Sequence, residues 1–186
     1  DEEAWILAVL SKQANCMFEF GTGTGKTAYL WARNSPPGAR VFTLALAPHH
    51  LESYTPAPGD SRSAARLALS GSGFTRFLYS GTPVEAKITQ LFADSKQFNE
   101  AAYLAQCDLV IVDGSHAYSY IQNDTEKALR MLKPGGILLW HDYREPVGSV
   151  RGVYRYLNQL RHKLPLVRLA RTSLVAYRSR PNQPQP

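Results

Sequence analysis

The sequence predicts an α/β fold with a mainly parallel seven-stranded sheet and helices on both of its faces. The first observation behind this prediction is that five apolar, strand-like runs alternate with runs of helical spacing, which is the pattern of parallel strands joined by crossover helices. The second is a glycine-rich turn directly after the first strand. The third is a pair of apolar runs, 164–169 and 173–177, spaced as a C-terminal antiparallel hairpin.

Each element follows from a local pattern. Apolar residues at helical spacing predict an opening helix, and Leu109 to Val112 are continuously apolar, as expected for a central parallel strand. Prolines and glycines interrupt residues 49–83, which we interpret as an insertion on the substrate side of the sheet. The expected helices are 2–13, 24–33, 61–69, 96–105, 120–132 and 149–162, and the expected strands before the hairpin are 15–20, 41–46, 88–93, 107–113 and 137–140.

The size of the chain fits one domain. With 186 residues, 44% hydrophobic and 19% charged, it is long enough to bury a core, and we assign residues 1–178 to this domain. The proline-rich tail, 179–186, is predicted to be disordered. No apolar run approaches the ~20 residues of a membrane helix, so no membrane association is expected. The chain starts at Asp1 rather than a methionine, which leaves open that it is a fragment.

Two cysteines, Cys16 and Cys107, lie in or beside strand-like runs. A disulfide scaffold needs more cysteines than this, so we interpret them as buried, reduced thiols and expect a cytoplasmic protein. The charge is uneven: from Arg144 onward nine Lys/Arg face one acid, a net +8, whereas the first 143 residues carry −2. This basic third is either a solvated face or a surface for an acidic partner such as RNA.

The segment FEFGTGTGKT at residues 18–27 nearly matches two motifs. One is the phosphate-binding loop G-x-x-x-x-G-K-[ST], whose first glycine would fall at Phe20. Without that glycine the loop cannot wrap a triphosphate in the usual way, so a nucleotide hydrolase is the least favoured function. Lys26 and Thr27 are then expected to be ordinary residues of the first helical turn.

The second motif is the E-x-G-x-G-x-G turn of Rossmann-like, doubly wound domains, which Glu19, Gly21, Gly23 and Gly25 satisfy fully. A strand, a glycine turn and a helix N-terminus form a seat for a nucleotide-like ligand. Other polar residues also fall where strands are predicted to end, and the carboxyl ends of parallel strands meet at one edge of a sheet. These strand-end residues are Glu19, Asp94, Asp113, His141 and Asp142.

The order of these motifs resembles that of class I S-adenosylmethionine-dependent methyltransferases. The matching segments are FEFGTGTGKT (18–27), ADS (93–95), CDLVIVDGSHAY (107–118), LKPGGILLWHDY (132–143) and TSLVAYR (172–178). They are most similar to those of a small bacterial group with a DGSHxY turn and an HDY strand end, of the methyltransferase domain family 24 type. The resemblance covers residues 15 to 178 and implies methyl transfer from S-adenosylmethionine.

The resemblance implies a set of cofactor-binding residues. The glycine turn would pass under the methionine part of the cofactor, and Glu19 would hold its ammonium group directly or through water. Asp94 would accept a hydrogen bond from the adenine amino group, beside the backbone of Ser95. Alternatively, Glu19 only braces the turn and Asp94 only caps the next helix. The implied set is Glu19, Gly21, Thr22, Gly23, Gly25, Ala45, Asp94, Ser95 and Asp113.

One position departs from the family pattern. The family usually carries an acid at the end of strand two, where it binds both ribose hydroxyls, and this chain has Ala45. A hydrogen bond to a charged group contributes about 1.5–3 kcal/mol, so its loss should weaken cofactor binding roughly ten- to a hundredfold. His49, His50 or Glu52 compensates for it, or binding is weak.

The strand ends around residues 113 and 141 predict the chemistry. In similar catechol O-methyltransferase-like enzymes, the places of Asp113, His141 and Asp142 hold a divalent metal such as Mg, which lowers the pKa of a substrate hydroxyl. Without metal, His116 or His141 is the candidate general base, since imidazole titrates near neutral pH. A third interpretation makes His141 and Asp142 a structural pair. The candidate catalytic residues are Asp113, His116 and His141.

The leading hypothesis is O-methylation of a small-molecule hydroxyl, assisted by a divalent metal. The second is an RNA methyltransferase that uses the basic C-terminal third, although no RNA-binding module is recognisable. The third is a non-catalytic protein that kept the fold and lost cofactor affinity, motivated by Ala45. The sequence identifies neither the methyl acceptor nor the oligomeric state, for which a homodimer is one option.

Overall fold

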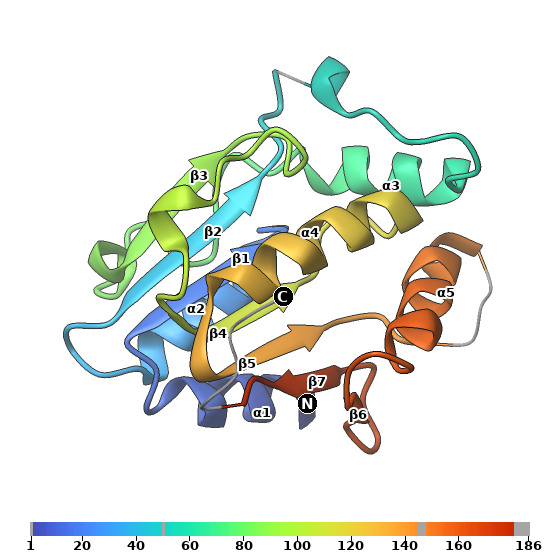
Figure 1. Cartoon of the computed structure of the whole chain (residues 1–186). Coiled ribbons are helices and arrows are strands. Elements are labelled where there is room, and N and C mark those ends of the chain that lie inside the picture. Colours follow the sequence, from blue (N-terminus) through green and yellow to red (C-terminus); the bar gives the residue numbers. More distant parts are fainter. Residues whose placement is uncertain (1, 50, 145–147, 181–186) are drawn as a thin grey trace.

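A computed structural model describes residues 2–49, 51–144 and 148–180. Its centre is one seven-stranded sheet in the order β3-β2-β1-β4-β5-β7-β6 (Figure 1). The pairs among the first five strands are parallel, whereas β7 runs antiparallel to both β5 and β6. This confirms the predicted sheet. The strands are β1 (Cys16–Phe20), β2 (Arg40–Ala45), β3 (Ile88–Phe92), β4 (Cys107–Val112), β5 (Leu132–Trp140), β6 (Val167–Arg168) and β7 (Val175–Arg178).

Helices cover both faces of this sheet, as the alternation of the sequence requires. α1 (Glu2–Ser11) and α2 (Lys26–Asn34) pack on one face, where Trp31 is fully buried. α4 (Tyr118–Met131) and α5 (Arg151–Leu160) cover the other face. Alternate strand residues serve the two cores: Met17 faces α2, and Phe18 faces the side of α4. α2 begins at Lys26, so Lys26 and Thr27 are first-turn residues as predicted.

The interrupted region 49–83 contains α3 (Arg62–Gly71) and the short 3₁₀ helix Leu51–Ser53. A second short 3₁₀ helix, Glu85–Lys87, follows this region. α3 lies beside the carboxyl-terminal side of the sheet, close to the N-terminal end of α4 (Figure 1). Polar contacts fasten the segment before it to α4: Asp60 accepts hydrogen bonds from the backbone N and the hydroxyl of Ser119, at 3.1 and 2.6 Å. The insertion is therefore built into the domain next to the strand ends.

The predicted helix over 96–105 is wrong. This segment forms turns and one short 3₁₀ helix, Ala101–Tyr103. The side chain of Lys127 explains the difference, because its ammonium group donates to the backbone carbonyls of Ser95, Lys96 and Phe98. These contacts hold the segment against α4 in a turn conformation. The contact joins positions about 30 residues apart in sequence, which local patterns do not reveal.

The prediction of two buried, reduced cysteines agrees with the structure. Both cysteines are buried and free, with their sulfur atoms 3.9 Å apart on neighbouring strands. In the described residues, none of the helices combines the length and the apolar character needed to cross a membrane. The prediction of a disordered tail over 179–186 is wrong at Ser179, which is buried and donates from its backbone N and its hydroxyl to the carbonyls of Gly136 and Lys133, at 2.9 and 2.8 Å. Residues 181–186 lie outside the described residues.

Candidate active site

A cavity opens at the carboxyl ends of the parallel strands, as the position of the glycine turn predicts. Four strand-end segments line it: residues 20–23 after β1, 44–46 at the end of β2, 93–95 after β3 and 113–116 after β4. The insertion contributes Tyr54 and one side of α3, including Leu67 and Ser72, while α4 contributes Tyr120 and Asp124. One cavity thus collects residues from six separate parts of the chain.

The glycine turn has the backbone geometry that only glycine tolerates well. Gly21 has φ of 99°, and its N–H donates to the carbonyl of Leu44 at 2.8 Å. A Cβ atom at Gly21 would lie 2.3 Å from the carbonyl oxygen of Asp113. Because β1 and β4 are neighbours, this turn passes directly under the start of the loop at residue 113. Side chains are thereby excluded from the floor of the cavity.

Glu19 lies beneath this turn rather than in the cavity. Its side chain is 1% exposed and accepts a hydrogen bond from the hydroxyl of Thr43 at 2.6 Å. Burial raises the pKa of Glu19 to about 8, against the opposing effect of the Thr43 hydroxyl. Neither Glu19 nor Gly25 belongs to the lining of the cavity. The geometry at Glu19 fits the bracing role, and its contact with an ammonium group stays a prediction.

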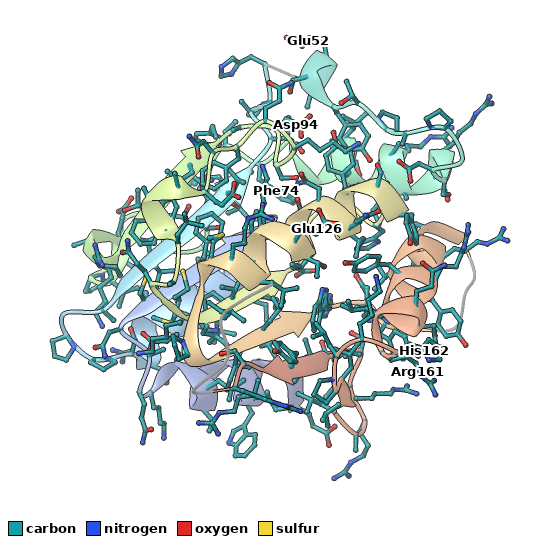
Figure 2. The ribbon with its side chains drawn as sticks, viewed as in Figure 1. Glu52, Phe74, Asp94, Glu126, Arg161 and His162 are labelled. Atoms are coloured by element: carbon teal, nitrogen blue, oxygen red, sulfur yellow. The ribbon has the colours of Figure 1, made fainter. Side chains whose placement is uncertain are left out.

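Asp94 and Ser95 lie at the other end of the cavity, after β3. Asp94 is buried, and its carboxylate accepts hydrogen bonds from the Tyr120 hydroxyl and the Lys96 backbone N, both at 2.8 Å. The predicted helix that Asp94 would cap is absent, so its carboxylate orders a turn instead. Figure 2 shows Asp94 in the loop beside the strand ends, between the insertion and α4. This placement leaves Asp94 facing the ligand side of the fold.

The sequence did not single out three polar contributors to this end of the cavity. Asp124 on α4 is fully buried, and burial raises its pKa to about 6 although Ser95 and Asn123 donate hydrogen bonds to it. The rings of Tyr54 and Tyr120 stack at 4.5 Å between centroids, and the Tyr54 hydroxyl pairs with Ser115 at 2.7 Å. Asp124 is buried on α4 together with Thr125 and Lys127, so its helix carries no simple apolar stripe that would have marked it out.

Ala45 lies in the cavity lining at the end of β2, where the sequence placed it. The proposed substitutes for the missing acid do not reach the cavity: His49 and Glu52 are exposed and are absent from its lining. Figure 2 shows Glu52 at the outer edge of the molecule. His50 lies outside the described residues. The wall at the end of β2 is apolar, since Leu44, Ala45 and Leu46 all belong to the lining.

Acidic and imidazole side chains cluster next to the cavity, at the ends of β4 and β5. His141 Nδ1 lies 3.1 Å from Asp113 Oδ1 and 3.3 Å from Asp142 Oδ2. The same Asp142 oxygen lies 3.1 Å from His116 Nε2. On the far side of the imidazole, His141 Nε2 is 3.0 Å from Glu3 Oε2 of α1. Asp113 and His116 also line the cavity, so the cluster and the cavity share two side chains.

The carboxylates around His141 decide its charge. Burial alone lowers the pKa of His141, but Asp113 and Asp142 outweigh burial and raise it to about 11. Burial raises the pKa of Asp142, yet His116 and His141 hold it well below its usual range. At neutral pH, His141 is therefore a cation among anions and does not act as a base in this arrangement. Of the two predicted bases, only His116 lines the cavity.

The geometry of the cluster fits a divalent metal. One donor atom each from Asp113, His141 and Asp142 lies within 4.8 Å of the other two. Ligands about 2.1 Å from a metal in octahedral geometry lie about 3 Å apart, close to the two distances measured from His141 Nδ1. This nitrogen is buried and, among the described residues, has no well-aligned hydrogen-bond partner. Asp142 also has φ of 58°, and such strain in a non-glycine residue concentrates at functional sites.

Comparison with known proteins identifies the class. The family model described as "Methyltransferase domain" matches residues 18–143. This span holds the glycine turn, the cavity and the ends of β4 and β5. The chain therefore belongs to this methyltransferase family, whose members are class I S-adenosylmethionine-dependent enzymes, as the motifs predicted. Among curated proteins, no significant match was found.

Solved structures with the same fold include methyltransferases with bound cofactor. Cofactor-bound Rv0187 from MTB shares 19% identity at a TM-score of 0.65, over 97% of this chain and 81% of that one. The O-methyltransferase TomG from Streptomyces achromogenes, solved with SAM, shares 19% identity at 0.60, over 96% and 80%. SAH-bound methyltransferase PaMTH1 from Podospora anserina shares 12% at 0.63, over 97% and 78%. At these identities the similarity establishes the shared fold.

Proposed function

We propose that this protein binds S-adenosylmethionine in the strand-end cavity and transfers its methyl group to the hydroxyl of a small molecule, with a divalent metal at the adjoining cluster. The observation that carries the proposal is the position of Asp113. It lines the cavity and lies 3.1 Å from His141 in the cluster, so one side chain links the two. A methyl donor and a metal-bound hydroxyl must lie side by side, and this arrangement provides adjacent places for them.

Each end of the cavity has a role in this proposal. Asp94 and Ser95 bind the adenine, and the backbone of residues 21–23 passes along the methionine part. Because the sulfonium is already an activated donor, the protein mainly aligns the reactants and excludes water. The cavity floor at Gly21 supports this, since the backbone there approaches without an intervening side chain.

Asp113, His141 and Asp142 are the residues that would hold the metal. A bound Mg or Mn would polarise the acceptor hydroxyl and lower its pKa. Asp142 also orients His116 through the contact of 3.1 Å, and His116 is placed between the cluster and the cavity. We assign to His116 the removal of the hydroxyl proton in a reaction without metal, because His141 is held in its charged form.

The first test is cofactor binding. Titration of S-adenosylhomocysteine into the full chain by calorimetry should give measurable binding. The affinity should be about ten- to a hundredfold lower than with an acid in place of Ala45. No binding at millimolar ligand would contradict the proposal and favour the non-catalytic alternative. A panel of catechols and other small hydroxyl compounds with labelled cofactor then tests methyl transfer itself.

The second test distinguishes a metal-dependent reaction from a metal-free reaction in which His116 is the base. Activity should disappear after exhaustive chelation and return with Mg or Mn. Full activity after chelation, together with loss of activity in His116→Gln, would favour the metal-free base. Activity that persists both after chelation and in Asp142→Asn would exclude a role for the metal.

The acceptor class rests on the resemblance to O-methyltransferases such as TomG and on the cluster. An RNA acceptor has weaker support, because no RNA-binding module is recognisable in the sequence, although the basic C-terminal third presents exposed cations such as Arg155 and Arg168. The guanidinium of Arg155 lies 5.6 Å from the ring centre of Tyr118, and that of Arg168 lies 5.8 Å from that of Tyr143. Figure 2 also shows Arg161 and His162 at the end of α5. Steeply salt-dependent RNA binding would overturn this preference.

A further inference from the structure

Glu3 connects the N-terminal helix α1 to the cluster at the strand ends. Its Oε2 lies 3.0 Å from Nε2 of His141, at the end of β5. Its Oε1 accepts hydrogen bonds from the backbone N and the hydroxyl of Ser173, at 2.6 and 2.9 Å. Both oxygens of one carboxylate are thus used, and they join three segments that are 138 and 170 residues apart in sequence.

The contact with Glu3 fixes the direction of the His141 ring. The two nitrogens of an imidazole lie on nearly opposite sides, so directing Nε2 at Glu3 directs Nδ1 at Asp113 and Asp142. Glu3 as a carboxylate only accepts, and therefore retains the hydrogen on Nε2. A metal that displaces the Nδ1 proton of the charged ring then finds the lone pair on Nδ1, the atom that belongs to the candidate metal site. Histidine ligands of metals commonly have such a carboxylate partner.

We propose that Glu3 is a positioning residue for the metal site: it orients His141 and selects the tautomer whose Nδ1 binds the metal. This inference rests on the proposed function, since it requires a metal at the cluster. It adds a role for helix α1, which lies outside the segment 18–143 matched by the family model. The site then needs the helix before β1 as well as the strand ends.

The competing explanation is that Glu3 only anchors α1 to Ser173. Besides Glu3→Ala, the variants Ser173→Ala and Glu3→Gln distinguish the two explanations. Ser173→Ala removes the hydroxyl donor at 2.9 Å and leaves the contact with His141 intact. Glu3→Gln keeps an oxygen for the Ser173 contacts while it presents a neutral group to His141. Anchoring alone predicts that Glu3→Gln, which keeps an acceptor for both Ser173 donors, leaves the site unchanged, whereas Ser173→Ala removes only one of these two donors.

The experiment is Mn²⁺ binding to the full chain, measured by electron paramagnetic resonance at fixed pH, with melting temperatures to confirm folding. We expect Glu3→Ala to weaken Mn²⁺ binding about 10- to 100-fold, Glu3→Gln to weaken it less, and Ser173→Ala to leave it within about twofold of the wild type. If Glu3→Ala fails to fold, the ratio of the Mn²⁺ affinities of Glu3→Gln and Ser173→Ala distinguishes positioning from anchoring.

The outcomes distinguish this inference from the proposed function. Wild-type affinity in a folded Glu3→Ala variant, with binding lost in Asp142→Asn, would overturn the role of Glu3 and leave the metal site standing. Wild-type affinity in Glu3→Gln, with a loss in Glu3→Ala, would also overturn it, in favour of simple anchoring. Absence of Mn²⁺ binding in the wild type would overturn both the metal site and the role of Glu3.

Discussion

The two adjoining parts of the site differ in how their polar groups are arranged. In the cavity, the Asp94 carboxylate already accepts a hydrogen bond from the Tyr120 hydroxyl, and the wall at Ala45 is apolar. In the cluster, Glu3, Asp113 and Asp142 surround a single imidazole. The cavity is thus organised to hold a ligand by shape and backbone, whereas the cluster concentrates charge on a small volume. Ligand affinity and chemistry should therefore respond to different substitutions.

The largest expected effect is on the cluster. Asp142→Asn removes one charged metal donor while keeping a residue that tolerates the positive φ of this position. We expect Mn²⁺ affinity to fall more than about 100-fold, beyond the effect of losing an outer-shell partner. Binding of S-adenosylhomocysteine, measured on the same sample, should change by less than about threefold because Asp142 is not part of the cavity lining. Equal losses of both ligands would contradict the separation of the two parts.

The next effect concerns the apolar wall of the cavity. Ala45→Asp should restore an acceptor for the ribose hydroxyls and tighten S-adenosylhomocysteine binding about ten- to a hundredfold. Ala45→Asn is the matched control of the same size without charge, and it should gain less. A folded Ala45→Asp protein with unchanged affinity would mean that the sugar does not lie at this wall and would support the non-catalytic alternative.

A smaller effect separates two glycines of the same turn. Gly21→Ala should lower the free energy of unfolding by more than about 1 kcal/mol, because φ is positive and the new Cβ would meet the Asp113 carbonyl. At Gly23 φ is also positive, but a Cβ would find no atom within 4 Å. Gly23→Ala should therefore cost less in denaturant titrations. The reverse order would show that the turn moves away from the strand at residue 113.

The last expected effect is a pH dependence. The folded pKa of Glu19 is raised to about 8 from 4.5, so the folded state keeps a proton that the unfolded state releases between these pH values. Its contribution to stability is complete below pH 4.5 and is lost as pH rises toward 8, with a slope of at most about 1.4 kcal/mol per pH unit. Glu19→Gln should flatten this slope in denaturant titrations at several pH values. An unchanged slope would contradict the buried, protonated Glu19.

Local patterns predicted the strands well, because a strand that is buried on both faces of the sheet has a continuous run of apolar residues. The run at Leu109–Val112 is apolar throughout and forms the centre of β4. The same reasoning failed for 96–105, where Lys127, from a distant part of the sequence, holds the segment in turns through its carbonyls. In the cluster, Asp113, His141 and Asp142 were predictable because parallel strands bring their ends together. Asp124 was not predicted, because its burial depends on how α4 packs.

The sequence by itself determined the order of the elements, the glycine turn, the missing acid at Ala45 and the family. These properties are local or follow from spacing along the chain. Only the tertiary structure decided that Glu19 lies under the turn, that His141 is a cation among carboxylates and that Glu3 reaches it across 138 residues. The reason is physical: charge state and ring orientation depend on which atoms lie within a few ångströms, and those atoms come from segments far apart in the chain.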